Sequence, residues 1–175
     1  MRIRNTESEF GLVTRVIHWL IAAVFISMIP VGWYMTGLSD TDVLYWRLLD
    51  LHILLGMSMF MLLPIKWGWQ LASSNPPLSS ALAPWERNTA RIVHSMLLVA
   101  MVAIPVTGFL FADSTGDPLE PFNLVEIPDL GQFSKSTRNV LGDAHYYLAY
   151  LCAALIVLHA AGAFKHRFID DAGGR

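Results

Sequence analysis

The sequence predicts an all-α membrane protein, a bundle of four transmembrane helices that forms a single domain over residues 1–175, with both termini in the cytoplasm. Three observations predict it. Hydrophobic residues make up 54% of the chain, charged residues only 15%, and the mean hydropathy is +0.47, which is too apolar for an ordinary soluble domain. The apolar residues gather in four runs, each long enough to cross a hydrocarbon core of about 30 Å. Basic residues are concentrated on one side of these runs.

The first two runs predict retained spans at about residues 16–38 and 48–71. The first is longer than the apolar core of a signal peptide, and no clear A-x-A cleavage site follows it. The segment after the second run is rich in Pro and Ser and predicts a loop. Tryptophans suited to the membrane interface lie on either side of this loop, at Trp67, Trp69 and Trp85.

The third and fourth spans are expected at about residues 90–112 and 141–164, separated by the longest connection, the predicted periplasmic loop 113–140. Three prolines in this loop oppose a continuous helix: Pro118, Pro121 and Pro128. The fourth span contains Cys152, the one cysteine of the sequence. A single thiol makes neither an intrachain disulfide nor a CxxCH haem attachment, so Cys152 is expected to be a small core or lipid-facing residue.

Four spans place both termini on one side of the membrane, and the basic residues predict which side. Nine lie on the terminal side: Arg2, Arg4, Arg15, Lys66, Arg87, Arg91, Lys165, Arg167 and Arg175. Three lie on the other: Arg47, Lys135 and Arg138. The excess on the terminal side predicts that both termini are cytoplasmic.

Five histidines fall within the four runs, at two depths. His145 and His159 are fourteen residues apart on the fourth run, which is about 21 Å of helix rise on nearly the same face. The outer level contains His52 and His145, and the inner level contains His18, His94 and His159. Polar groups are costly inside a bilayer and usually mark function, so each level is expected to bind something. His166 lies beyond the last span.

A weak internal repeat relates the two halves of the chain. Arg15-x-x-His18, Pro30-Val31-Gly32 and Asp50-x-His52 are echoed by Arg91-x-x-His94, Pro105-Val106-Thr107-Gly108 and Asp143-x-His145. Duplication and chance similarity between apolar segments both account for it. The counterpart of His159 is Lys66, which is not a ligand, and the repeat leaves open whether His159 pairs with His18 or with His94.

Haem fits these histidines better than zinc does. Structural zinc needs four N or S ligands, and each level offers too few. An iron porphyrin needs only two axial imidazoles, and a helical bundle can bury its apolar ring. Small residues one turn from three of the histidines offer room for such a ring: Gly56, Ala149 and Ala22. Arg15 and Arg91 lie one turn from inner-level histidines and either pair with haem propionates or serve as positive-inside anchors.

Several sequence motifs resemble those of a known family. Ile17-His18-Trp19, His52 at the start of the second span, Asp143-x-His145 with His159 fourteen residues later, and the tail from Lys165 to Asp171 resemble the bacterial di-haem cytochrome b561 family. The resemblance covers nearly the whole chain. It implies that His18 and His159 hold the inner haem, that His52 and His145 hold the outer haem, and that His94 is a non-ligand near propionates or a quinone.

The function implied by the resemblance is electron transfer in the bacterial cytoplasmic membrane, with two haem b groups as cofactors and quinone as substrate. One family activity is the oxidation of superoxide with reduction of ubiquinone. The acidic outer loop would not steer an anion inward, although Arg47, Lys135 and Arg138 could form a positive patch. The expected partners are membrane lipid, quinone and a periplasmic electron donor or soluble redox protein, with no nucleic acid.

Two alternatives from other classes remain open. One is a membrane subunit that relays electrons for a separate dehydrogenase or soluble cytochrome, which co-purification of that partner would favour. The other is a transporter whose histidines bind a metal or relay protons, which a colourless purified protein would favour.

Overall fold

The computed structural model describes residues 2–74, 76–77, 82–113, 120–124, 131 and 133–170. Within these residues the chain is helical and has no strand, which confirms the predicted all-α class. The helices are α1 (Leu12–Met35), α2 (Val43–Leu71), α3 (Pro84–Asp113), the 3-10 turn η1 (Pro121–Asn123), α4 (Lys135–Lys165) and the π-helical turn η2 (His166–Asp170).

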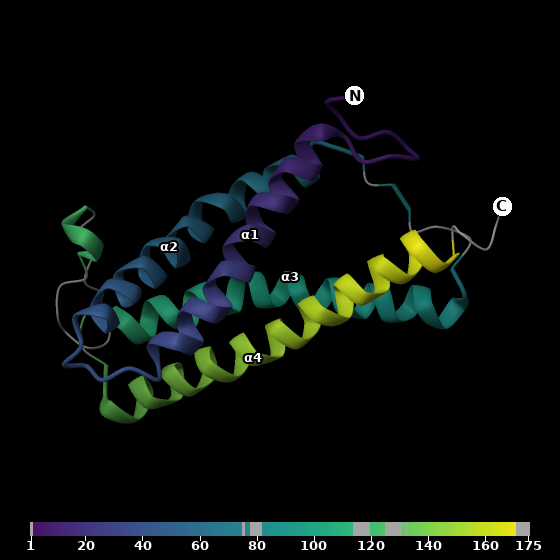
Figure 1. The fold of residues 1–175 in the computed structure, drawn as a ribbon. Helices are drawn as coiled ribbons and strands as arrows, with labels where there is room; N and C mark the ends of the chain where they lie inside the picture. Colours follow the sequence, from purple (N-terminus) through teal and green to yellow (C-terminus); the bar gives the residue numbers. More distant parts are fainter. Residues whose placement is uncertain are drawn as a thin grey trace.

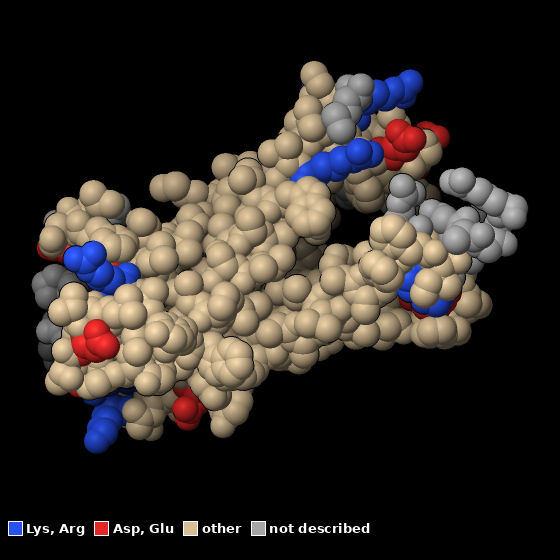
Figure 2. All heavy atoms as spheres, in the orientation of Figure 1, with Lys and Arg blue, Asp and Glu red and all other residues tan. Residues whose placement is uncertain are grey.

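The four long helices form two pairs, α1 with α2 and α3 with α4. Further contacts join α2 to α3, whereas α1 meets α4 over only a short stretch. The described ends of the chain lie at the same end of the bundle, and the two pairs diverge toward that end (Figure 1). Figure 2 shows a hollow between the diverging pairs. The bundle is therefore tighter at the opposite end, where η1 packs against α2.

The surface of the bundle is that of a membrane-spanning protein. All four long helices are long and apolar enough to cross a bilayer. In Figure 2 the charged side chains gather at the two ends of the molecule, with an uncharged band between them. Large apolar side chains point outward within this band, among them Trp19 at 67% exposure and Val157 at 69%. On four helices of this length and composition, such an apolar exterior is typical of a surface that faces lipid.

Helices α2 and α4 begin before their apolar runs, at polar residues that cap them. Asp42 caps α2 by accepting from Leu44 N at 2.8 Å, and Ser134 caps α4 by accepting from Thr137 N at 3.2 Å. The predicted loop 113–140 is therefore wrong at its end, since residues 135–140 are helical. The first helix also ends at Met35, three residues before the predicted boundary at 38.

The N-terminal segment folds back on the start of α1. Leu12 N and Val13 N donate to the carbonyl oxygens of Arg2 and Ile3, at 2.9 and 3.3 Å. Asn5 ties this turn to two helices: its Oδ1 accepts from Gly11 N and from the Thr14 hydroxyl, and its Nδ2 donates to Ser74 O, just beyond α2. The inner ends of α1 and α2 are thereby held together.

A compact apolar core separates the two histidine levels. Its buried members are Ile21, Phe25, Met59, Leu63, Ala100, Ile104 and Cys152. On α4, Cys152 lies midway between His145 and His159, and on the other three helices the core residues follow the one histidine by between three and eleven residues. Cys152 is only 2% exposed, so it is a core residue, one of the two places the sequence allowed.

Candidate cofactor-binding site

At the outer level, His52 of α2 and His145 of α4 face each other. Their ring centroids are 5.9 Å apart and their planes cross at 82°. Two imidazoles on one metal ion, each with its nitrogen about 2 Å from the metal, have centroids about 6.3 Å apart. The spacing of this pair therefore fits a shared metal without a change in the helices.

Hydrogen bonding makes the two outer histidines different. His145 Nδ1 lies 3.0 Å from the carbonyl oxygen of Ile104 on α3. A carbonyl only accepts, so Nδ1 carries the proton and Nε2 keeps a free lone pair, which is the tautomer a metal ligand needs. Neither nitrogen of His52 has a hydrogen-bond partner within the described residues, and its Nδ1 is buried. A half-buried imidazole with a buried, unpartnered nitrogen fits a side chain that binds a group through its ring.

Two glycines allow the rings of His52 and His145 to lie close to the backbones of α1 and α3. A Cβ at Gly108 of α3 would lie 2.7 Å from His145 Cε1, and one at Gly32 of α1 would lie 3.2 Å from His52 Cε1. Gly56, which the sequence singled out as room for a haem ring, has Met28 Cε 3.6 Å from its would-be Cβ. Gly32 and Gly108 hold equivalent places in the internal repeat.

At the inner level, three histidines come together from α1, α3 and α4. The centroids of His18 and His159 are 6.2 Å apart with planes at 62°, which again matches the spacing across a shared metal. His94 is closer to His159, with centroids 5.0 Å apart and its Nε2 3.2 Å from His159 Nδ1, a direct hydrogen bond. Lys66, the repeat counterpart of His159, instead donates to Gln70 Oε1 at 2.9 Å.

At the inner level the histidines are open to a flat group. His18 and His94 are exposed, although they lie at the depth of the bundle interior, and the helix pairs diverge on this side. No group of three or more His, Cys, Asp or Glu side chains able to hold a metal ion was found among the described residues. The donor set is thus imidazole pairs with space between helices, which is the arrangement that a bis-histidine haem requires.

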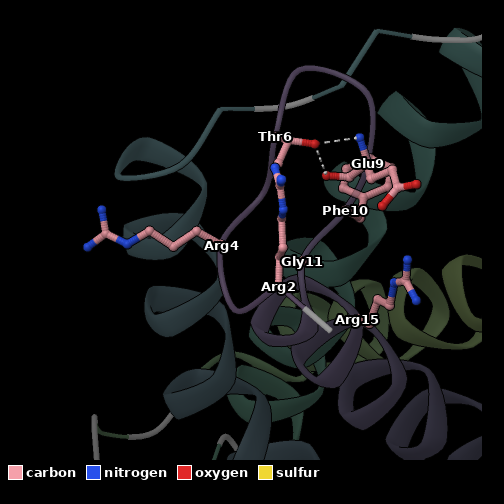
Figure 3. A pocket seen from close by; sticks show the side chains of 7 residues that line it. All are labelled: Arg2, Arg4, Thr6, Glu9, Phe10, Gly11 and Arg15. Carbon is pink, nitrogen blue, oxygen red and sulfur yellow. Dashed lines mark hydrogen bonds between the residues drawn. The ribbon is translucent and has the colours of Figure 1, made fainter.

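Arg15 and Arg91 are both exposed on the inner side, and no ion pair is found for either within the described part of the chain. Arg15 also borders a small cavity of about 170 Å³ at the N-terminal turn, together with Arg2, Arg4 and Glu9. In Figure 3 the side chains of Arg4 and Arg15 point away from each other, so the cavity does not focus these charges on one ligand. The two inner-side arginines remain available to acidic groups of a cofactor.

Comparison with known proteins identifies the family of the chain. The family model for prokaryotic cytochrome b561 matches residues 9–172. The chain belongs to the prokaryotic cytochrome b561 family. Cytochrome b561 homolog 2 of Escherichia coli (strain K12) is 30% identical over 170 residues, covering 97% of this chain and 90% of that protein. This cytochrome is therefore a multi-pass protein of the bacterial inner membrane that transfers electrons on b-type haem.

More distant relatives of this cytochrome were also found. A protein of Yersinia pestis named probable superoxide oxidase CybB is 23% identical over 156 residues, which cover 87% of this chain and 85% of that protein. Cytochrome b561 homolog 1 of Escherichia coli (strain K12) is 24% identical over 158 residues, covering 88% and 87%. The predicted family, cofactor type and localisation are thereby confirmed.

Proposed function

We propose that this cytochrome b561 binds two haem b groups and carries electrons between the two faces of the inner membrane, with quinone as a redox partner. The observation that carries the proposal is the occurrence of two histidine pairs at two depths, with centroids 5.9 and 6.2 Å apart. His52 and His145 hold the outer haem, and His18 and His159 hold the inner haem. When bound, each haem supplies an iron that alternates between the ferric and ferrous states.

The residues of the chain set the conditions for this transfer. Two imidazoles on each iron leave no open coordination position, which favours electron transfer over oxygen chemistry at the metal. The apolar core between the levels excludes water and fixes the helices that carry the ligands. Arg15 and Arg91, exposed on the inner side, pair with propionates of the inner haem.

The test of the haem assignment is a dithionite-reduced minus oxidised spectrum of the detergent-purified protein, with haem counted per chain. We expect two haems in the wild type and in His166→Ala, which alters a histidine outside both pairs. His18→Ala and His159→Ala are expected to lose one haem each. A colourless wild-type protein would refute the proposal and favour a metal or proton transporter, whereas retention of both haems in His18→Ala would refute the inner ligand pair.

Quinone and the electron donor need separate measurements. Reconstituted protein reduced in advance should be reoxidised by a water-soluble ubiquinone analogue, and this rate should fall in the variants that lack the inner haem. Superoxide, suggested by the name of the Yersinia pestis relative, is tested as a donor by haem reduction with xanthine oxidase, with superoxide dismutase as the control. If only a co-purifying soluble protein reduces the haem, the chain is a relay subunit.

The orientation is proposed from the basic residues, with both termini cytoplasmic. Single cysteines at Ser74 and at Thr41, each in a Cys152→Ser background, mark the two ends of α2. A membrane-impermeant maleimide added to intact spheroplasts should label the variant at 41 and leave the variant at 74 unlabelled. The opposite pattern would invert the topology and exchange the inner and outer levels.

A further inference from the structure

His94 contacts the site without belonging to either histidine pair. It lies on α3, and its Nε2 is 3.2 Å from Nδ1 of His159 on α4. Two nitrogens on opposite sides of one iron, each about 2 Å from it, are about 4 Å apart. The contact between His94 and His159 is therefore a hydrogen bond between ring nitrogens and leaves no room for a metal between those two atoms.

The direction of this bond follows from ligation. If His159 binds iron through Nε2, that nitrogen carries no proton, so the neutral ring is protonated at Nδ1. His159 Nδ1 then donates and His94 Nε2 accepts, which puts the proton of His94 on its own Nδ1. The reverse assignment would leave the proton of neutral His159 on Nε2 and block ligation there.

We propose that His94 is a positioning residue for the inner haem: it accepts the Nδ1–H of His159 and thereby fixes the ring and the tautomer in which Nε2 meets the iron. This inference rests on the proposed function. The outer level has the same arrangement, since His145 Nδ1 lies 3.0 Å from Ile104 O, also on α3. Helix α3 thus supplies the acceptor for both α4 histidines, from a backbone carbonyl at the outer level and from a side chain at the inner level.

The acceptor affects the iron as well as the ring. A hydrogen bond from His159 Nδ1–H to His94 makes the imidazole of His159 more basic. A more basic ligand favours the ferric state of the iron. Loss of a partner that bonds to a metal ligand typically costs 10- to 100-fold in metal affinity or activity. We expect removal of the acceptor to shift the ferric-to-ferrous preference of the inner haem about tenfold, which raises its midpoint potential by about 59 mV for a one-electron couple.

The experiment is a redox titration of the purified holoprotein with His94 replaced by Leu, which lacks an acceptor, or by Gln, whose side-chain oxygen can replace Nε2. Each variant is also examined by low-temperature electron paramagnetic resonance of the ferric haems. We expect His94→Leu to retain both haems, raise the inner potential and alter the inner ferric signal, whereas His94→Gln stays near wild type. The outer haem, whose ligand bonds to a backbone carbonyl, is the internal reference. If the Leu variant does not accumulate, His94→Met removes the acceptor in its place.

Three results would overturn the inference, and they differ from one another. An unchanged inner potential in the acceptor-free variants would mean that the hydrogen bond does not act on the iron, while leaving the two-haem proposal intact. Loss of the inner haem in both His94→Leu and His94→Gln, with retention in His18→Ala, would make His94 a ligand. Absence of haem from the wild type would refute the proposed function itself and this inference with it.

Discussion

Gly108 is expected to set the position of the outer ligand His145, and replacing it with Ala tests this directly. The added Cβ would lie 2.7 Å from His145 Cε1 and 2.8 Å from Nδ1, whereas ordinary contact begins at about 3.4 Å. The ring must therefore move by about 0.7 Å. Its hydrogen bond to Ile104 O is already 3.0 Å long, and such bonds weaken beyond about 3.2 Å, so the shift removes the acceptor.

The energies give the expected size of the effect. Overpacking costs about 1–3 kcal/mol, and the lost hydrogen bond costs about 1 kcal/mol. The higher helix propensity of Ala stabilises the protein with and without haem alike, so it does not change haem binding. A loss of about 2–4 kcal/mol in the ligating position corresponds to outer-haem retention that is weaker by about thirtyfold to several hundredfold. The assay is haem per chain after dilution into haem-free detergent, with the outer haem identified as the one missing from His52→Ala.

The chain provides graded controls for this substitution. A Cβ at Gly32 would lie 3.2 Å from His52 Cε1, so Gly32→Ala requires a shift of only about 0.2 Å and should weaken outer-haem retention less. A Cβ at Gly162 of α4 meets nothing within 4 Å, so Gly162→Ala should be neutral or slightly stabilising. The reasoning is refuted if Gly108→Ala retains the outer haem as well as Gly162→Ala does.

Two further predictions concern the inner end of the bundle. Asn5→Ala removes the side chain that joins Gly11 N, Thr14 and Ser74 O, so trypsin should cleave the N-terminal segment faster while haem content is unchanged; equal digestion rates would contradict this linking role. Glu86 accepts from Ala83 N and forms an ion pair with Lys165 at 2.7 Å, so Glu86→Ala should cost about 1 kcal/mol or more and lower the thermal midpoint. Lys165→Met removes the ion pair but leaves the bond from Ala83 N to Glu86 in place and should cost less, so a larger effect of Lys165→Met would contradict the capping role of Glu86.

The sequence was sufficient to predict what depends on depth and periodicity. The four spans follow from apolarity, and the meeting of His52 with His145 follows because both lie at the outer end of their helices. The helix ends were less predictable, since α2 and α4 begin at polar caps outside the apolar runs. Finer contacts between helices were not predicted: the approach of Gly108 to His145 and the acceptor Ile104 O depend on how α3 rotates against α4, which no local pattern encodes.

The inner level shows that the two halves of the repeat have diverged. A symmetric inner site would join His18 to His94, because these positions are equivalent in the repeat. His159 breaks the symmetry, since its own counterpart is Lys66, which bonds to Gln70. The ring of His159 lies at metal-sharing distance from His18 and at hydrogen-bond distance from His94, so equivalent histidines occupy unequal places. In the proposed di-haem protein, His18 would bind the inner iron and His94 would position the second ligand, His159. A substitution of His94 would therefore change the potential of the inner haem although His94 does not bind its iron.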